Sequence, residues 1–363
     1  MNASAVGMSK WELDTPALCL DAAALGRNIQ RMGDYFRDRA AALRPHCKTH
    51  KCPTIAWMQQ RAGAIGITCA KVSEAEVMAQ AGIQDILIAN QAVGSNKIER
   101  LANLAAYTRV MVAVDNAENA TALSAAAQAK GIALRVLVEV DVGMQRCGVA
   151  PGRPSLTLAG HVVSLPGLRL EGIMGYEGHA VAISDFDERR RVAEEAVGKL
   201  IATRDLLERN GIAVGIVSAG GTGTYDISGN CEGVTEIQAG SYATMDAKYQ
   251  GVGIDFELAL TIVSQVVSVT EPNIAIIDAG AKSATTESGM PRLIRPEGWY
   301  LLKLSEEHGH LRRQGGEQLH VGDVVEMVPS HGCTTINLYD AYHVIRDDIV
   351  EAVWPVAARG CNR

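Results

Sequence analysis

Short apolar segments alternate with helical segments along most of the chain. Between residues 20 and 255 about eight apolar segments recur, and an amphipathic segment follows most of them. Near-continuous apolar strands between helices are typical of a parallel sheet that helices cover. About eight such units in roughly 230 residues predict a (β/α)8 TIM-type barrel. The expected strands lie within residues 41–50, 64–70, 85–90, 109–115, 134–143, 168–178, 212–223 and 234–246.

The pattern changes after residue 255. The later segments are strand-like and separated by turns, and few of them have helical periodicity. We therefore predict a barrel domain over residues 20–255 and a second, mainly β domain from residues 1–19 and 256–363. The strand-like segments of the second domain include residues 258–270, 273–280, 319–330 and 343–360.

The 363-residue chain has the composition of an ordinary globular protein, with 47% hydrophobic and 21% charged residues. Its formal net charge of -7 argues against nucleic acid or an anionic membrane as a partner. No segment approaches the length of a transmembrane helix, and the N-terminus has no apolar signal-peptide core. The eight cysteines form no CxxC pair, which is typical of reduced thiols, so we expect a cytoplasmic protein.

Basic side chains are concentrated in the segment LRPHCKTHKCP, residues 43–53, at the end of the first expected barrel strand. Side chains on a strand alternate between its two faces. A strand here would therefore place Arg44, His46, Lys48 and His50 on one face. Taken alone, the segment has an alternative interpretation as a basic loop in contact with solvent.

Glycine-rich segments follow the last two expected barrel strands, SAGGTGTYD from residue 218 and QAGSY from residue 238. Glycines let backbone N–H groups approach an anion closely, and hydroxyl groups add further donors. In a barrel these two loops are the usual phosphate site, although loops can be polar and glycine-rich without binding anything. They do not contain the GK[ST] pattern of a P-loop.

A phosphate site on the barrel rim together with Lys48 suggests pyridoxal 5'-phosphate as the cofactor, attached through Lys48. A free lysine side chain has a pKa of about 10.4, which is too high for a good nucleophile. Burial and cationic neighbours lower this pKa. The candidate neighbours are Arg44, His46, His50 and Lys51.

A histidine and a cysteine stand two residues apart in the late segment PSHGCTTINLYD. On a strand these side chains, His331 and Cys333, share one face and can bind one cation together. A nitrogen ligand with a soft sulfur favours zinc, with manganese or magnesium as alternatives. Two protein ligands leave coordination positions for water and substrate, as a catalytic site requires. By itself, a buried cysteine beside a histidine is more often inert.

The motifs RPHCKTHK, VDVGMQRCG, GYEGH, SAGGTGTY and QAGSYATMD resemble those of the fold-type III pyridoxal-phosphate enzymes, whose prototype is alanine racemase. The segments PSHGCTTINLYD and VEAVWPVAARG resemble the branch of D-threonine aldolase and D-serine dehydratase. The resemblance covers almost the whole chain. It implies a barrel with a β domain, a small D-amino-acid substrate, a divalent metal, and a homodimer with its sites near the subunit interface.

The resemblance also implies roles for individual residues. Lys48 matches the Schiff-base lysine, Arg146 an arginine near the cofactor's phenolic oxygen, and Tyr176 a residue beside the cofactor ring. The alternatives are a helix cap or a rim salt bridge for Arg146 and a core position for Tyr176, and His179 is a candidate acid or base. The expected phosphate cup consists of Gly221, Thr222, Gly240, Ser241 and Tyr242. Three further candidates, which line the site or occupy surface positions, are Asp278, Lys282 and His308.

Aldolase members of this branch resemble HCD at the metal segment, with His and Asp as ligands, whereas dehydratase members resemble HxC. Cys333 therefore favours β-elimination, in which a D-3-hydroxy amino acid gives an oxo acid and ammonia. The alternative is retro-aldol cleavage, of the D-threonine aldolase or 3-hydroxy-D-aspartate aldolase type, to glycine and an aldehyde. Two further alternatives are an amino-acid racemase, which needs a second base and no metal, and a non-catalytic pyridoxal-phosphate carrier.

Overall fold

The structure, a computed structural model, describes residues 5–363, and these group into two compact units. The first, which we call the barrel unit, contains residues 32–48, 55–240 and 361–363. The second, which we call the β unit, contains the chain up to Arg31 together with residues 49–54 and 241–360. Helix α1 (Ala22–Phe36) belongs partly to each unit.

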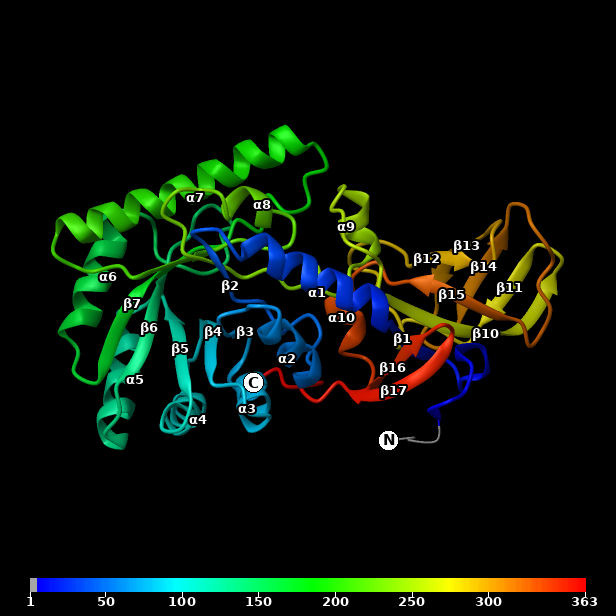
Figure 1. Cartoon of the computed structure of the whole chain (residues 1–363), viewed down its shortest axis with the longest axis horizontal. Helices are drawn as coiled ribbons and strands as arrows, with labels where there is room; N and C mark the ends of the chain where they lie inside the picture. The colour runs from blue at the N-terminus through cyan, green and yellow to red at the C-terminus, as the bar shows by residue number, and fades with distance from the viewer. Residues whose placement is uncertain (1–4) are drawn as a thin grey trace. The chain divides into compact units, whose positions relative to one another are not determined.

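Eight parallel strands form the centre of the barrel unit. They are β2 (Ala42–Leu43), β3 (Ile67–Cys69), β4 (Asp85–Gln91), β5 (Arg109–Val114), β6 (Leu134–Glu139), β7 (Leu168–Met174), β8 (Ile216–Ala219) and β9 (Glu236–Ile237). Their order in the sheet is β2-β9-β8-β7-β6-β5-β4-β3, and Figure 1 shows β4 to β7 beside one another. A bridge between His46 and Thr68 joins the two ends of the sheet. The prediction of a TIM-type barrel is confirmed.

Helices follow most of these strands along the chain. They are α2 (Pro53–Arg61), α3 (Val72–Gln80), α4 (Ser95–Ala105), α5 (Ala117–Lys130), α6 (Arg153–Ser164), α7 (Phe186–Arg209) and α8 (Tyr225–Ser228). Local sequence sets their ends: α5 begins where the Asn116 side chain accepts a hydrogen bond from the Asn119 amide. It ends at Gly131, whose φ of 64° lies in the left-handed region that glycine adopts easily.

Apolar side chains of neighbouring barrel strands form one buried cluster. Its members are Leu87, Met111, Ala113, Leu137 and Met174. Because strand residues two apart share a face, the positions before Leu87 and Leu137 on this face are the charged residues Asp85 and Arg135. The apolar cluster therefore continues into a charged group near the amino ends of the strands.

Arg44 belongs to this charged group rather than to a cationic face with Lys48. The predicted strand over residues 41–50 is wrong beyond β2, since residues 47–50 form turns. The Arg44 side chain is buried and forms ion pairs with Glu236 (2.9 Å) and Asp85 (2.6 Å). Burial lowers the pKa of Arg44, but the two carboxylates outweigh burial and raise it overall. The charge of Arg44 is therefore compensated at the amino ends of β4 and β9.

A nine-stranded sheet forms the β unit and confirms the prediction of a second, mainly β domain. Strand β1 (Ala17–Asp21) pairs antiparallel with β10 (Leu260–Glu271) and parallel with β16 (Ala341–Arg346). The long strand β10 also pairs with β11 (Ile274–Ile277) and β15 (Val324–Val328), as the right-hand part of Figure 1 shows. The remaining elements are η2 (Lys10–Glu12), β12 (Arg292–Arg295), β13 (Trp299–Leu304), β14 (Gly309–Arg313), β17 (Ile349–Pro355), α9 (Ala247–Gly251) and α10 (Gly332–Ile336).

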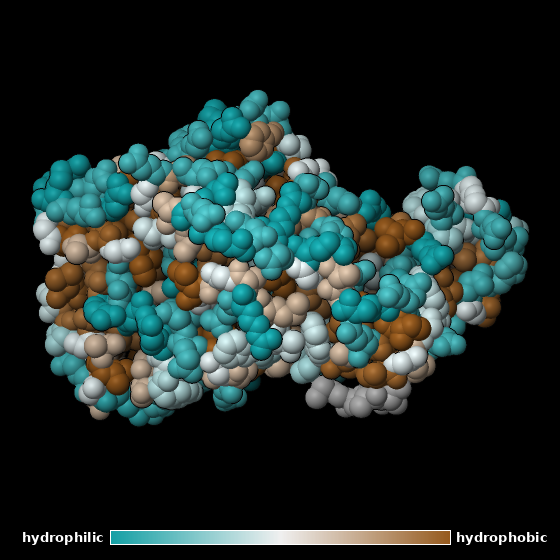
Figure 2. Space-filling model, in the orientation of Figure 1, coloured by the Kyte–Doolittle hydropathy of each residue, from teal (hydrophilic) through white to brown (hydrophobic). Residues whose placement is uncertain are grey.

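The surface combines polar residues with scattered apolar ones. On the face that Figure 2 shows, hydrophobic residues lie among hydrophilic ones. Singly exposed apolar side chains of this kind are normal in globular proteins. Among residues 5–363, no helix is long and apolar enough to cross a membrane.

Candidate active site

Three of the predicted cofactor residues meet near the carboxyl ends of the barrel strands. Lys48 follows β2, Arg146 lies in the loop after β6, and Tyr176 follows β7. The Nζ atom of Lys48 is 5.9 Å, and the Cζ atom of Arg146 is 5.7 Å, from the centre of the Tyr176 ring. Aromatic rings attract cations within about 6 Å of the ring centre. Tyr176 therefore adjoins both a potential nucleophile and a permanent positive charge.

The two histidines of the basic segment bond to nearby backbone amides. The Nδ1 atom of His46 accepts a hydrogen bond from the Lys48 amide (3.4 Å), and that of His50 accepts one from the Cys52 amide (3.1 Å). Arg44 is already paired with Asp85 and Glu236, so it is not an uncompensated positive neighbour of Lys48.

A buried carboxylate lies beneath the first glycine-rich loop. Glu177, next to Tyr176 in the chain, is 1% exposed. It accepts hydrogen bonds from the Gly220 amide (3.2 Å) and the Thr224 hydroxyl (2.7 Å), while the Gly221 amide donates to the Thr224 hydroxyl (3.2 Å). The amides of these two glycines therefore bond to side chains of the protein and not to a ligand.

Gly221 instead allows the loop to approach the Tyr176 ring. A Cβ atom at this position would lie 3.1 Å from the ring, closer than neighbouring atoms normally come. Thr222, the next residue, is buried, and Gly240 follows β9, the strand beside β8. The loops after these two strands are therefore neighbours at the rim that also carries Lys48.

His179 is exposed and packs beside the loop that carries Arg146. A Cβ atom on Gly143, whose φ is 132°, would lie 3.1 Å from the Cε1 atom of His179. Glycine is therefore required at this contact for both space and backbone conformation. The ring of His179 can exchange protons with water, because its side chain is not enclosed.

The predicted metal ligands contact each other in the β unit, but not on a strand. His331 is the N-cap residue of α10 and Cys333 lies in its first turn, so the predicted strand is wrong. A hydrogen bond with Cys333 is the main cause that raises the pKa of His331 to about 9, against the effect of burial. The Nδ1 atom of His331 contacts Glu287 (2.8 Å), which leaves Nε2 for Cys333. One nitrogen and one sulfur donor are thus adjacent.

Asp246 explains why this segment turns. One oxygen of its carboxylate accepts a hydrogen bond from the Gly332 amide at the start of α10 (3.0 Å). The other accepts one from the Tyr249 amide at the start of α9 (3.0 Å). Burial raises the pKa of Asp246, and the two backbone hydrogen bonds oppose that rise. A single carboxylate therefore caps two short helices and holds the turn between His331 and Cys333.

The last two residues of the expected phosphate cup lie in the β unit. The hydroxyl of Ser241 is 3.7 Å from the sulfur of Cys333, whose thiol also donates to the Thr49 hydroxyl (3.3 Å). Tyr242 is fully buried, and its ring centre is 5.6 Å from that of Phe256. Ser241 therefore adjoins the metal pair, whereas the Tyr242 ring packs in the core of this unit.

Three further candidates have contacts that fit a place outside the site better than a place in its lining. They are Asp278, Lys282 and His308. The Asp278 carboxylate accepts a hydrogen bond from the Thr15 hydroxyl (2.5 Å). Lys282 is exposed and paired with Glu307 (2.5 Å), and His308 is exposed as well. These contacts are typical of a strand end and a surface turn.

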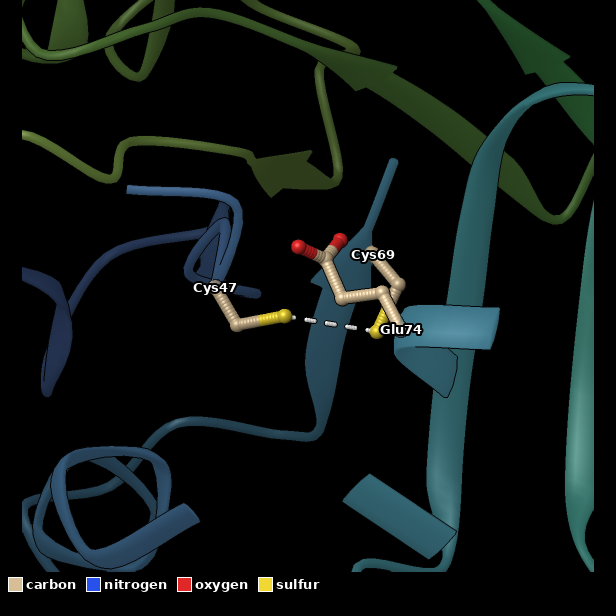
Figure 3. A group of neighbouring side chains, drawn as sticks. All are labelled: Cys47, Cys69 and Glu74. Atoms are coloured by element: carbon tan, nitrogen blue, oxygen red, sulfur yellow. Dashed lines mark hydrogen bonds between the residues drawn. The ribbon is translucent and has the colours of Figure 1, made fainter. Parts of the chain in front are cut away.

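Two thiols and a carboxylate come together at a place that sequence reasoning missed. The sulfurs of Cys47 and Cys69 are 3.3 Å apart, and Glu74 completes a buried group whose potential ligand atoms all lie within 4.8 Å of one another (Figure 3). Glu74 also accepts a hydrogen bond from the Ala70 amide (2.5 Å). The signal was the equivalent position of the two cysteines, since Cys47 and Cys69 each follow directly on one residue of the bridge between His46 and Thr68. This group is a second location at which a soft metal could bind.

Comparison with known proteins gives two family matches. Residues 20–248 match the alanine racemase N-terminal domain, and residues 259–345 match the putative serine dehydratase domain. D-threonine aldolase of Arthrobacter sp is 40% identical over 97% of this chain and 94% of its own length. 3-Hydroxy-D-aspartate aldolase of Paracoccus denitrificans (strain Pd 1222) is 39% identical over 98% and 94%. D-threo-3-hydroxyaspartate dehydratase of Delftia sp. (strain HT23) is 28% identical over 94% and 97%.

Solved structures of similar proteins also match this chain over almost its whole length. The crystal structure of D-threonine aldolase from Filomicrobium marinum has a TM-score of 0.95 and 39% identity, with 99% of each chain covered. A cysteine-to-alanine mutant of D-threo-3-hydroxyaspartate dehydratase, in the metal-free form, has a TM-score of 0.87 and 26% identity, covering 96% of this chain and 98% of its own. The chain therefore belongs to the alanine racemase N-terminal domain family, among the members that also carry a serine dehydratase domain.

Proposed function

We propose that this protein is a lyase that uses pyridoxal 5'-phosphate and a divalent metal to convert D-3-hydroxy amino acids, by β-elimination, into an oxo acid and ammonia. The observation that carries the proposal is the meeting of Lys48, Arg146 and Tyr176 at the carboxyl ends of the barrel strands. The names of the relatives supply the substrate class, since threonine and 3-hydroxyaspartate both carry a hydroxyl on Cβ.

The residues of the barrel rim fit the cofactor. Lys48 offers the amine for its aldehyde, the Tyr176 ring offers a flat apolar face, and Gly221 keeps that face clear of a side chain. When bound, the cofactor supplies an electron sink for the negative charge that develops at the substrate Cα. The proposed phosphate site consists of the two neighbouring loops that contain Gly221, Thr222, Gly240, Ser241 and Tyr242.

The protein's own groups then move the protons. The amine of Lys48 takes the proton from the substrate Cα as general base. Arg146 keeps its charge at any working pH and is proposed to hold the phenolic oxygen of the cofactor. His179 is the second proposed acid or base, because it is exposed beside the loop that carries Arg146 and can exchange protons with solvent.

His331 and Cys333 are the proposed metal ligands. Their donor atoms are adjacent, and Glu287 at Nδ1 of His331 orients Nε2 toward the sulfur, an arrangement typical of metal-binding histidines. Nitrogen and soft sulfur favour zinc over manganese or magnesium. When bound, the cation supplies a Lewis acid for the substrate hydroxyl, since hydroxide is too basic to leave unaided. A cysteine at this position supports elimination.

Retro-aldol cleavage is the second candidate, and the relatives favour it. The two relatives at 39–40% identity are named aldolases, whereas the dehydratase is 28% identical. In this reaction a base removes the proton of the β-hydroxyl, the Cα–Cβ bond breaks, and the products are glycine and an aldehyde. Both reactions need the same cofactor and the same ligands, so product analysis must distinguish them.

A panel of D-3-hydroxy amino acids tests the proposal, with ammonia and glycine assayed separately. D-serine, D-threonine, D-3-hydroxyaspartate and D-phenylserine cover small, polar and aromatic side chains. We expect ammonia and an oxo acid in equal amounts from at least one of them. Glycine in equal amounts with an aldehyde would instead establish the aldolase. Loss of chirality without either product would indicate a racemase, and cofactor binding without any turnover would indicate a carrier.

We also propose that the protein is a cytoplasmic homodimer. The dimer follows from the resemblance to fold-type III enzymes, and the location follows from the eight cysteines, all of which are free thiols in the structure. Light scattering of the purified protein should give about twice the chain mass of 38.6 kDa. A particle with the mass of one chain would overturn the proposed dimer.

A further inference from the structure

Glu177 is a buried carboxylate in a place where negative charge is unexpected. It follows Tyr176 and lies beneath the loop between β8 and α8, on the rim that we propose binds a phosphate group. Its side chain is 1% exposed, so solvent does not stabilise its charge. A buried carboxylate persists only if it is well hydrogen-bonded, so its partners indicate what it does.

Its partners span the whole loop and the helix after it. Besides the Gly220 amide and the Thr224 hydroxyl, Glu177 accepts a hydrogen bond from the hydroxyl of Ser228 in α8. The Gly221 amide joins the network through Thr224. One amide and two hydroxyls can thus donate to the carboxylate, and donors of this kind are what a buried carboxylate needs.

The network determines which loop groups face away from Glu177. The amides of Gly220 and Gly221 are directed into the protein, and the left-handed φ of 78° at Gly220 makes this reversal of the chain possible. Gly223 sits against the Val181 carbonyl, so closely that a Cβ atom would lie 2.3 Å from its oxygen. Within the described chain, the Gly223 amide has no hydrogen-bond acceptor. The Gly223 amide, next to the proposed phosphate ligand Thr222, is therefore the backbone donor of this loop that remains for a ligand.

We infer that Glu177 is a positioning residue for the cofactor's phosphate group: its charge gathers the donors of the Gly220–Ser228 loop and so presents Thr222 and Gly223 to the phosphate. The inference rests on the proposed function, because it concerns the same cofactor. It adds a role for a residue that touches neither the proposed nucleophile nor the proposed metal ligands.

Positioning by Glu177 and simple electrostatic repulsion predict opposite effects of the substitution Glu177→Gln on the affinity for pyridoxal phosphate. A negative charge near a phosphate dianion repels it, so charge alone predicts that Glu177→Gln binds pyridoxal phosphate more tightly. Positioning predicts the opposite, because the amide group of glutamine is a donor and meets the donors of Gly220, Thr224 or Ser228. The distorted loop would then bind the phosphate less well.

The experiment titrates cofactor-free protein with pyridoxal phosphate and with pyridoxal, which lacks the phosphate. For Glu177→Gln we expect the affinity for pyridoxal phosphate to fall about tenfold to a hundredfold, as for the loss of hydrogen bonds to a charged group. The affinity for pyridoxal should change less than about threefold. Ser228→Ala removes one donor without adding another, so it should give a smaller loss of the same kind in a protein that retains its fold.

Glu171→Gln is the matched control. Glu171 lies in the middle of β7, the strand before Glu177, where it pairs with Arg135 (2.8 Å) and Arg169 (2.5 Å). The control should leave the ratio of the two affinities unchanged. An unchanged or higher affinity of folded Glu177→Gln for pyridoxal phosphate, or an equal loss for both ligands, would overturn the inference. Wild-type protein that binds neither ligand would overturn the proposed function instead.

Discussion

Arg44 and Lys48 come from one short segment but contact different groups. Arg44 forms two buried ion pairs, whereas Lys48 approaches the ring of Tyr176. Sequence could predict that Lys48 lies near Tyr176, because the carboxyl ends of parallel barrel strands meet at one rim. It could not predict the partners of Arg44, since Asp85 and Glu236 are distant in the chain and no local rule connects them.

Removing the guanidinium of Arg44 should destabilise the protein without affecting cofactor binding. In Arg44→Met, the carboxylates of Asp85 and Glu236 lose their partner, and breaking a buried ion pair costs about 3–5 kcal/mol. Urea unfolding should show this loss, while the folded protein should still bind pyridoxal phosphate. The exposed pair of Arg190 with Asp187 provides the control, since Arg190→Met should change stability by about 0.5 kcal/mol or less. Equal losses in the two variants would contradict the structural role of Arg44.

There are two candidate metal sites that contain thiols. One is the pair of His331 and Cys333, and the other is the buried group of Cys47, Cys69 and Glu74. One pair of variants distinguishes between them. We expect about one zinc per chain in the wild type, and almost none in Cys333→Ala, because one of the two proposed ligands is lost. Cys69→Ala should keep its zinc, although Cys69 adjoins Cys47 and Glu74 (Figure 3). Metal analysis after dialysis makes the comparison. Zinc lost from Cys69→Ala and kept in Cys333→Ala would move the metal to the barrel unit.

At the scale of elements, the short helix α10 shows where local pattern ceases to be informative. Most barrel strands were predictable because they carry their own apolar run between turn residues, whereas the first expected strand, over residues 41–50, ends at β2. Helix α10 has only five residues, too few to show a helical period, and it begins soon after the apolar strand β15. Its start depends on Asp246, whose carboxylate binds the Gly332 amide from far away in the chain.

Loss of the Asp246 carboxylate should weaken metal binding even though both ligands remain. In Asp246→Ala the Gly332 amide loses its partner, so the turn between His331 and Cys333 is no longer held. Groups that orient metal ligands typically contribute about 10-fold to 100-fold in affinity. Competition with a chelator should show a loss of zinc affinity in this range.

Asp185→Ala is the control for this prediction. Asp185 caps α7 in the barrel unit, where it accepts a hydrogen bond from the Glu188 amide (2.8 Å). Its loss should cost about 1 kcal/mol of stability and leave zinc affinity unchanged. Equal zinc affinity in Asp246→Ala and the wild type would show that the turn does not depend on Asp246.

At the scale of the whole molecule, the two kinds of chemistry are divided between the two units. Lys48, Arg146 and Tyr176 belong to the barrel unit, and His331 and Cys333 belong to the β unit. The two family matches follow the same order along the chain, over residues 20–248 and 259–345. The fold was predictable because both units have local patterns. The substrate bond that breaks could not be predicted, because it depends on how the substrate lies relative to groups from distant elements.

Reduction with borohydride, followed by peptide mapping, tests most directly whether Lys48 carries the cofactor. In protein saturated with pyridoxal phosphate, we expect the reduced pyridoxyl group on the peptide that contains Lys48, because this amine lies beside Tyr176 at the barrel rim. Lys48→Ala should lose both this label and nearly all turnover. A label on another lysine, or saturated protein that takes no label, would contradict the account.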